Sequence, residues 1–96
     1  MMIWLVTVRA AEGRSERVRA LLQSELLPLL RATPDCRDPQ LAACVNCAGE
    51  HTYLAFWPER SAVERLEADP TYRATLDRLS GYLPVPPKRE LWEILA

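Results

Sequence analysis

The stretch MIWLVTVR, residues 2–9, decides the fold of this 96-residue chain. Successive side chains of a β-strand point to opposite faces of the sheet. Both alternating sets of this stretch are mainly apolar: Met2, Trp4, Val6 and Val8 against Ile3, Leu5, Thr7 and Arg9. Such a pattern is typical of a strand in a sheet that is covered on both sides. We therefore predict a central strand with two buried faces.

The segments that follow predict a helix and then a hairpin. Between residues 14 and 32 apolar side chains recur at three- and four-residue spacing, as on one face of a helix, and Pro28 should kink it. Two short apolar runs, residues 41–45 and 52–57, flank a turn-forming segment with Asn46. This arrangement predicts two antiparallel strands.

The last third of the chain predicts a broken helix and a final strand. A capping box at Ser61–Glu64 should begin the helix, and Asp69 should cap a second part that starts at Pro70. Residues 88–95 then return to extended character. The predicted order is β-α-β-β-α-β, an α+β fold of ferredoxin-like type in which a four-stranded antiparallel sheet carries its helices on one face.

We expect residues 1–96 to form a single domain, because this length supports one core between a sheet and a helical layer. The helices can cover only one face of the sheet. The predicted strands nevertheless offer apolar residues to both faces, so the second face needs a cover. We expect that cover to be a second copy of the chain, which gives a homodimer.

Composition and charge limit the partners. Apolar residues make up 49% and charged residues 26%, a balance typical of globular proteins. The net charge is -1 and neither sign collects in a block, so we expect no nucleic-acid partner. The apolar start, residues 2–6, is too short for a signal peptide or a membrane span, which predicts a cytoplasmic protein with no membrane partner.

Four segments carry a resemblance to a known family; they are Leu26–Ala32, Pro34–Cys36, Phe56–Ala62 and Ala68–Arg73. Through them the chain resembles the antibiotic-biosynthesis-monooxygenase-like (ABM) group of dimeric α/β barrels. The resemblance covers nearly the whole chain. It implies a homodimer in which the C-terminal strand reaches onto the partner. It also implies the group's chemistry, which includes cofactor-free quinol oxygenation and haem degradation.

The resemblance favours one branch of that chemistry. The haem-degrading branch lines its pocket with Asn, Trp and His, and the matching positions here are Val6, Leu66 and Leu76. None of these side chains can ligate iron, which disfavours haem. The quinol-oxygenating branch holds its substrate with an Asn and a Trp. Here Tyr53 takes the place of the Asn, and Trp57 is retained.

Trp57, Tyr53 and Tyr72 are the candidate substrate pocket. Trp57 and Tyr53 have the same parity on one strand, so an indole and a phenol share a face. They are suited to flank a flat aromatic substrate and to donate hydrogen bonds to its oxygens. The alternative is that these rings pack the core or a dimer seam. Trp4 and Trp92 carry the same two interpretations.

The cysteines and the one histidine supply metal-type ligands. Cys36, Cys44, Cys47 and His51 are of the kinds that zinc prefers. We expect Cys44 in a strand and Cys47 in a turn, which does not aim them together, and an odd number of cysteines favours reduced thiols. A structural zinc and a Cys44–Cys47 redox pair are the alternatives. His51 follows a turn, so we expect it at the surface rather than in proton transfer.

The functional prediction is a cofactor-independent monooxygenase, or a related small-molecule enzyme, that acts on an aromatic or quinol-type substrate. We expect no cofactor and no bound metal. The alternative is a non-catalytic homodimer of the same fold that binds a small apolar or aromatic ligand or acts as an interaction module.

Overall fold

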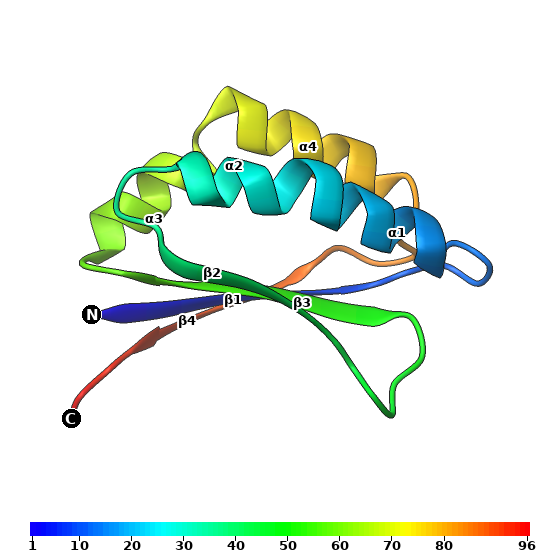
Figure 1. Cartoon of the computed structure of the whole chain (residues 1–96), viewed down its shortest axis with the longest axis horizontal. Helices are drawn as coiled ribbons and strands as arrows, with labels where there is room; N and C mark the ends of the chain where they lie inside the picture. Colours follow the sequence, from blue (N-terminus) through cyan, green and yellow to red (C-terminus); the bar gives the residue numbers. More distant parts are fainter.

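The computed structural model describes residues 1–96 as one sheet with a layer of helices (Figure 1). The elements in chain order are β1 (Met2–Arg9), α1 (Ser15–Leu21), the π-helical turn η1 (Leu22–Leu26), α2 (Leu27–Ala32), β2 (Arg37–Ala43), β3 (Glu50–Trp57), α3 (Arg60–Glu67), α4 (Pro70–Ser80) and β4 (Lys88–Glu93). None of the helices is long and apolar enough to cross a membrane.

The sheet has four antiparallel strands in the order β2-β3-β1-β4. All the helices lie on one of its faces, above the strands in Figure 1. β1 is central, as its pattern predicts, and pairs with β3 on one side and β4 on the other. The ferredoxin-like β-α-β-β-α-β fold is therefore confirmed.

The helix predicted over residues 14–32 is confirmed as one continuous run, α1-η1-α2. Pro28 lies inside this continuous run, as the second residue of α2, where it cannot donate a backbone hydrogen bond to the preceding turn. The wider turn η1 comes directly before it. The irregularity expected at Pro28 is therefore accommodated by a π-helical turn, which is a common form of irregularity within helices.

The second helical region is broken where the sequence predicts, but its start differs. α3 begins at Arg60 with Glu59 as the N-cap and without a side-chain cap. The capping box predicted at Ser61–Glu64 is wrong, because Ser61 already lies inside the first turn. Asp69 caps α4 as predicted: its carboxylate accepts hydrogen bonds from the backbone N–H groups of Thr71 (2.7 Å) and Tyr72 (3.3 Å).

The hairpin is confirmed with a shifted first strand. β2 spans Arg37–Ala43 instead of residues 41–45, and its pairing with β3 shifts between Arg37 and Gln40. Asp38 has a positive φ of 48° within this irregular part. At its other end the strand stops at Ala43, so Cys44 belongs to the turn.

The face of the sheet under the helices carries the core. Alternate residues of β1 and β3 are buried there, and leucines of the first helical run pack on them. The strand residues of this core are Trp4, Val6, Val8, Tyr53, Ala55 and Trp57.

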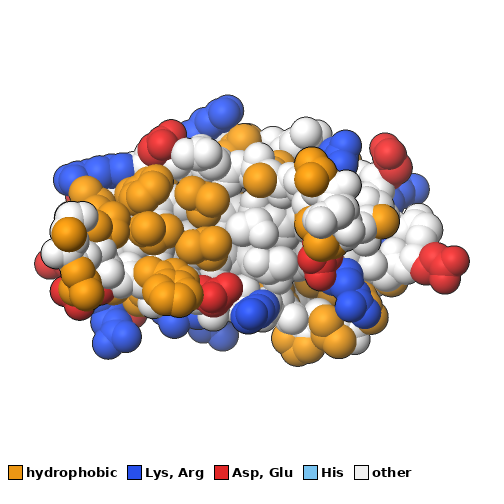
Figure 2. All heavy atoms as spheres, turned by 90° about the horizontal axis from the view of Figure 1, so that it is seen from below, with side chains coloured by type: hydrophobic (Ala, Val, Ile, Leu, Met, Phe, Trp, Pro, Cys, Tyr) orange, Lys and Arg blue, Asp and Glu red, His pale blue; other side chains and the backbone are white.

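The opposite face of the sheet has no helix over it and is partly apolar. Ile3 lies opposite Phe56 and Trp92, and Leu5 lies opposite Leu54, so the five side chains share this face. Figure 2, seen from the open side of the sheet, shows apolar side chains gathered over one half of it. Trp92 is 57% exposed in the single chain. We call these five residues the open apolar face.

Candidate functional site

Four aromatic rings meet between the sheet and the helices. Trp4 lies at their centre, with ring centroids 5.3 Å from Tyr53, 5.7 Å from Trp57 and 5.9 Å from Tyr72. β1 supplies Trp4, β3 supplies Tyr53 and Trp57, and α4 supplies Tyr72. The four side chains are 0–3% exposed. The three residues singled out in the sequence are thus brought together, and we call the four rings the aromatic cluster.

The aromatic cluster holds hydrogen-bond donors that the chain does not use. The hydroxyls of Tyr53 and Tyr72 lie 2.8 Å apart and share one hydrogen bond. One of them donates to the other, so the second hydroxyl proton has no acceptor within the chain. The indole Nε1 of Trp57 is buried and also has no partner. Buried donors without acceptors are costly, so an acceptor supplied from outside would be stabilised here.

Both phenols of the cluster remain protonated. Loss of hydration on burial is the main cause that raises the pKa of Tyr53 and Tyr72 far above the usual phenol value. Neither can act as a base near neutral pH. They are donors, and a ligand oxygen with negative charge would suit them best.

An ion pair borders the aromatic cluster. The Nε1 group of Trp4 donates to Glu67 Oε2 at 3.3 Å, and Arg89 donates to both oxygens of Glu67 at 2.7 Å and 2.8 Å. These bonds raise the pKa of Arg89. Glu67 is the carboxylate in contact with the cluster, and both of its oxygens already accept hydrogen bonds.

Sequence reasoning missed Glu67 and Arg89. Arg89 shares its parity on β4 with Leu91 and lies opposite Val6, so it is on the helix side of the sheet. This alternation along β4 was the sequence signal that could have placed Arg89 on the helix side of the sheet. The partner, Glu67, is the last residue of α3 and is distant in sequence, so no local pattern joins the two.

His51 is buried, which corrects its expected place at the surface. It is 2% exposed, because it shares the parity of Tyr53 and Trp57 on β3 and faces the helices. Its Nε2 accepts a hydrogen bond of 3.2 Å from Arg19 Nε. His51 and Trp57 lie near opposite ends of β3, about 20 Å apart at the rise of an extended strand, so His51 is not part of the aromatic cluster.

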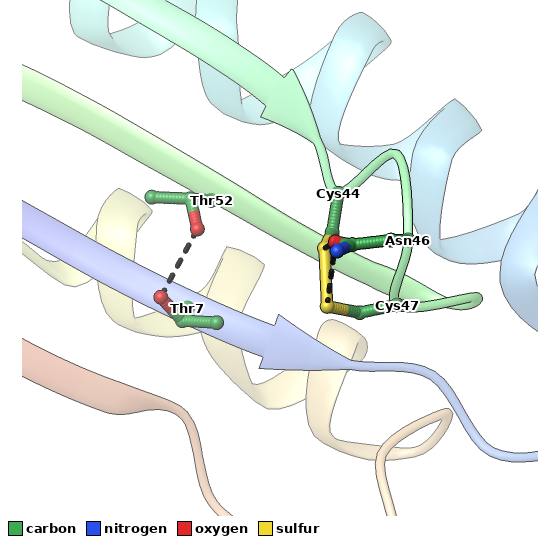
Figure 3. The surroundings of a disulfide bond; sticks show 5 residues. All are labelled: Thr7, Cys44, Asn46, Cys47 and Thr52. Carbon is green, nitrogen blue, oxygen red and sulfur yellow. Dashed lines mark hydrogen bonds between the residues drawn. A yellow bond between two sulfur atoms is a disulfide. The ribbon is translucent and has the colours of Figure 1, made fainter.

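Cys44 and Cys47 form a disulfide, which corrects the expectation of reduced thiols that point apart (Figure 3). Because β2 ends at Ala43, both cysteines lie in the turn, and their Cα atoms are 5.2 Å apart, a normal separation for a disulfide. Figure 3 shows the Asn46 side chain beside the two sulfurs. The third cysteine, Cys36, is free, and burial raises its pKa to about 11.

The predicted set of zinc-type ligands is not brought together. The ligand atoms that cluster within 4.8 Å of one another belong to Cys44, Cys47 and Glu50. Cys36 precedes the other end of β2, and His51 lies under the helices. The absence of bound zinc therefore stays a prediction. Its reason is now that Cys36 and His51 lie away from the Cys44–Cys47 disulfide.

Reduction of the disulfide should leave the fold intact. Cys44 and Cys47 are three positions apart, so the bond constrains only a very short loop and should contribute about 2 kcal/mol or less. The Cys44 N–H to Glu50 carbonyl hydrogen bond of 3.0 Å already closes the hairpin. We expect urea unfolding with and without dithiothreitol to differ by no more than this amount. Cys36→Ser is the control, and global unfolding on reduction would contradict the expectation.

The fold and the cluster define a ferredoxin-like α+β protein with a buried aromatic site, and solved structures share this fold. No protein-family model and no curated protein matches the chain. A crystal structure of an antibiotic biosynthesis monooxygenase is 17% identical, with 100% of both chains covered and a TM-score of 0.89. A Mycobacterium tuberculosis protein is 19% identical over 99% of this chain and 95% of that one, with a TM-score of 0.87.

A third similar structure contains a ligand. It is a monooxygenase of Streptomyces coelicolor in complex with nanaomycin D, 18% identical over 99% of this chain and 88% of that one, with a TM-score of 0.82. The chain therefore has the fold of the antibiotic biosynthesis monooxygenase structures. Fold similarity at this level of identity leaves the reaction to be argued from the site.

Proposed function

We propose that the chain is a cofactor-independent monooxygenase of hydroxylated or carbonyl-bearing aromatic compounds, and that Trp57, Tyr53 and Tyr72 hold the substrate. The observation that carries the proposal is the pair of donors without acceptors in the aromatic cluster, the Trp57 Nε1 and one tyrosine hydroxyl. A flat substrate offers ring faces to the aromatic side chains and an oxygen to these donors. The monooxygenase structure solved with nanaomycin D supports the same class of reaction.

The chemistry needs little from the protein beyond placement. A substrate CH2 group beside a conjugated carbonyl loses a proton, and the resulting anion passes an electron to O2. One oxygen atom enters the substrate as a carbonyl and the other leaves as water, so the substrate supplies all four electrons. Glu67 is held by Arg89 and Trp4, and both phenols stay protonated, so we propose that the substrate binds as its anion, which the two donors stabilise.

Substrate entry requires a movement of α4. The four rings are almost fully buried, and α4, which supplies Tyr72, contacts α3 and η1 and takes no part in the strand pairing. A displacement of α4 therefore opens the cluster without disturbing the pairing of the strands. Closure over the substrate would exclude water from the anion.

We also propose a homodimer in which the open apolar face of one protomer packs on that of the other. Ile3, Leu5, Leu54, Phe56 and Trp92 would otherwise stay in water in a contiguous patch. A two-fold pairing covers both copies with the same residues. The C-terminal residues, of which Leu95 is 89% exposed, extend the seam. A cytoplasmic location and the absence of a cofactor stay predictions.

Binding is tested without oxygen by a matched pair of ligands. Anthrone and 9,10-dihydroanthracene have the same three-ring shape, and only anthrone has a carbonyl oxygen. In an anaerobic titration followed by tryptophan fluorescence, we expect anthrone to bind about tenfold tighter, because its oxygen accepts from the unused donors. Equal affinities, or no saturable change with either compound, would contradict the proposed site.

Replacement of both tyrosines, in the double variant Tyr53→Phe/Tyr72→Phe, should weaken anthrone binding two- to tenfold, the usual value of one hydrogen bond. The double variant removes the free hydroxyl proton and keeps both rings, whereas either single variant leaves one hydroxyl that can still donate to the ligand. Tyr82→Phe is the control, because Tyr82 is half-buried beside the core and outside the cluster. The same anaerobic titration measures both variants. A loss for Tyr82→Phe as large as that for the double variant would place the ligand elsewhere.

The second candidate function is a non-catalytic homodimer that binds a small aromatic ligand or acts as an interaction module. The observation in its favour is the lack of an uncommitted base: Glu67 is ion-paired with Arg89 and accepts from Trp4, and both phenols stay protonated. This candidate predicts anthrone binding with no consumption of oxygen.

A further inference from the structure

A hollow of about 210 Å3 lies beside His51, away from the aromatic cluster. Arg19 and Gln23 line it from the first helical run, Leu41 and Ala43 line it from β2, and His51 lines it from β3. It therefore sits where the helix crosses the edge of the sheet. Nothing in the proposed oxygenase uses these residues.

Arg19 brings an unneutralised positive charge to the hollow. Its Nε donates to His51 Nε2, and its two Nη groups make no hydrogen bond and no ion pair within the chain. A guanidinium offers five N–H donors in a planar fork that fits a carboxylate. The fork is thus free on the side that does not face His51.

His51 orients the guanidinium from the wall of the hollow. Because Nε2 accepts from Arg19, the ring proton must sit on Nδ1, which is buried. Loss of hydration, followed by the charge of Arg19, lowers the pKa of His51; the Gly49 carbonyl opposes this shift. The ring is therefore neutral at pH 7 and holds the guanidinium in place as an acceptor.

The remaining walls are suited to an amphipathic ligand. Gln23 supplies a neutral amide that can donate beside the guanidinium. Leu41 and Ala43 supply apolar surface on the opposite side. The hollow thus combines one charged anchor, one amide and an apolar wall.

We propose that this hollow binds a small monocarboxylate with an apolar tail, its carboxylate on the Arg19 fork and the Gln23 amide and its tail on Leu41 and Ala43. A single guanidinium matches the single charge of a carboxylate, and the bidentate pair is among the stronger hydrogen-bonded contacts in proteins. The site is separate from the aromatic cluster, so a test of carboxylate binding does not depend on whether the protein is an oxygenase.

Benzoate is the probe, and His51 is the reporter. It is the single histidine of the chain, so its ring signals in a 1H-13C NMR spectrum are free of overlap. We expect a saturable shift of these signals with benzoate and none with benzamide, which has the same shape without the charge. An absence of shift at 20-fold molar excess and above, or equal shifts with both compounds, would overturn the proposal, whatever the variants do.

Two arginine variants on the same helix locate the binding charge. Arg19→Gln should weaken benzoate binding at least about tenfold, because a charged hydrogen-bonded pair is lost. Arg17→Gln removes a charge of the same sign from an exposed position outside the hollow and should change the affinity less than twofold. Retained binding in Arg19→Gln, or the same loss in both variants, would overturn the assignment.

Discussion

Trp57→Phe is expected to lower oxygenase activity about 100-fold while the protein stays folded. The change keeps an aromatic ring on β3 but removes Nε1, one of the two donors available to the substrate anion. Loss of one donor to a developing or bound oxyanion typically costs this much in rate. The cost in stability should be smaller than for a truncation to alanine, about 1–2 kcal/mol, because most of the buried ring remains.

Two measurements separate these effects for Trp57→Phe. Oxygen uptake with a panel of anthrones and hydroquinones gives the rate, and urea unfolding gives the stability. Trp92→Phe is the matched control, because it also loses an indole but from the open apolar face, on the other side of the sheet from the cluster. An unchanged rate in Trp57→Phe would remove Trp57 from the site.

Trp92→Glu should convert the dimer to monomer or cause it to aggregate. Trp92 lies opposite Ile3 on β1, within the open apolar face that we propose to be the dimer seam. A carboxylate placed in an apolar seam has no partner, and the two-fold axis brings in a second one. The expected cost is several kcal/mol, enough to dissociate a dimer at micromolar concentration.

Sedimentation equilibrium checks this prediction at micromolar concentration. The wild type should show twice the chain mass, and Trp92→Glu should shift toward the mass of one chain. Val85→Glu is the control, since Val85 is 52% exposed and lies in the loop between α4 and β4, away from the face. A stable, soluble wild-type monomer would contradict both the dimer and the role given to the open apolar face.

The fold was readable from the sequence because its signals are local. The alternation of β1 predicts which residues face the helices, and the helix-facing set, Trp4, Val6 and Val8, is the buried one. The same period of two places Tyr53 and Trp57 together on β3. Applied to His51 it would have placed that ring inside as well. Its position next to a turn was the weaker signal and misled the prediction.

The site was only partly readable because its remaining parts depend on distant contacts. The Cys44–Cys47 pair forms because β2 ends at Ala43 and leaves both cysteines in the turn, which no spacing of cysteines reveals. The Glu67–Arg89 ion pair joins the end of α3 to β4, two elements distant in sequence. The hollow at Arg19 arises where a helix crosses the sheet edge, so it requires the packed structure.

Oxygen uptake by the wild-type protein tests the proposed oxygenase most directly. The protein is first treated with a chelator and dialysed, and then mixed with anthrone in air-saturated buffer while an electrode follows dissolved O2. We predict uptake that scales with protein concentration, with one O2 consumed for each anthrone converted to anthraquinone. Saturable binding of anthrone with no uptake above the protein-free rate would contradict the oxygenase and support the non-catalytic ligand-binding dimer.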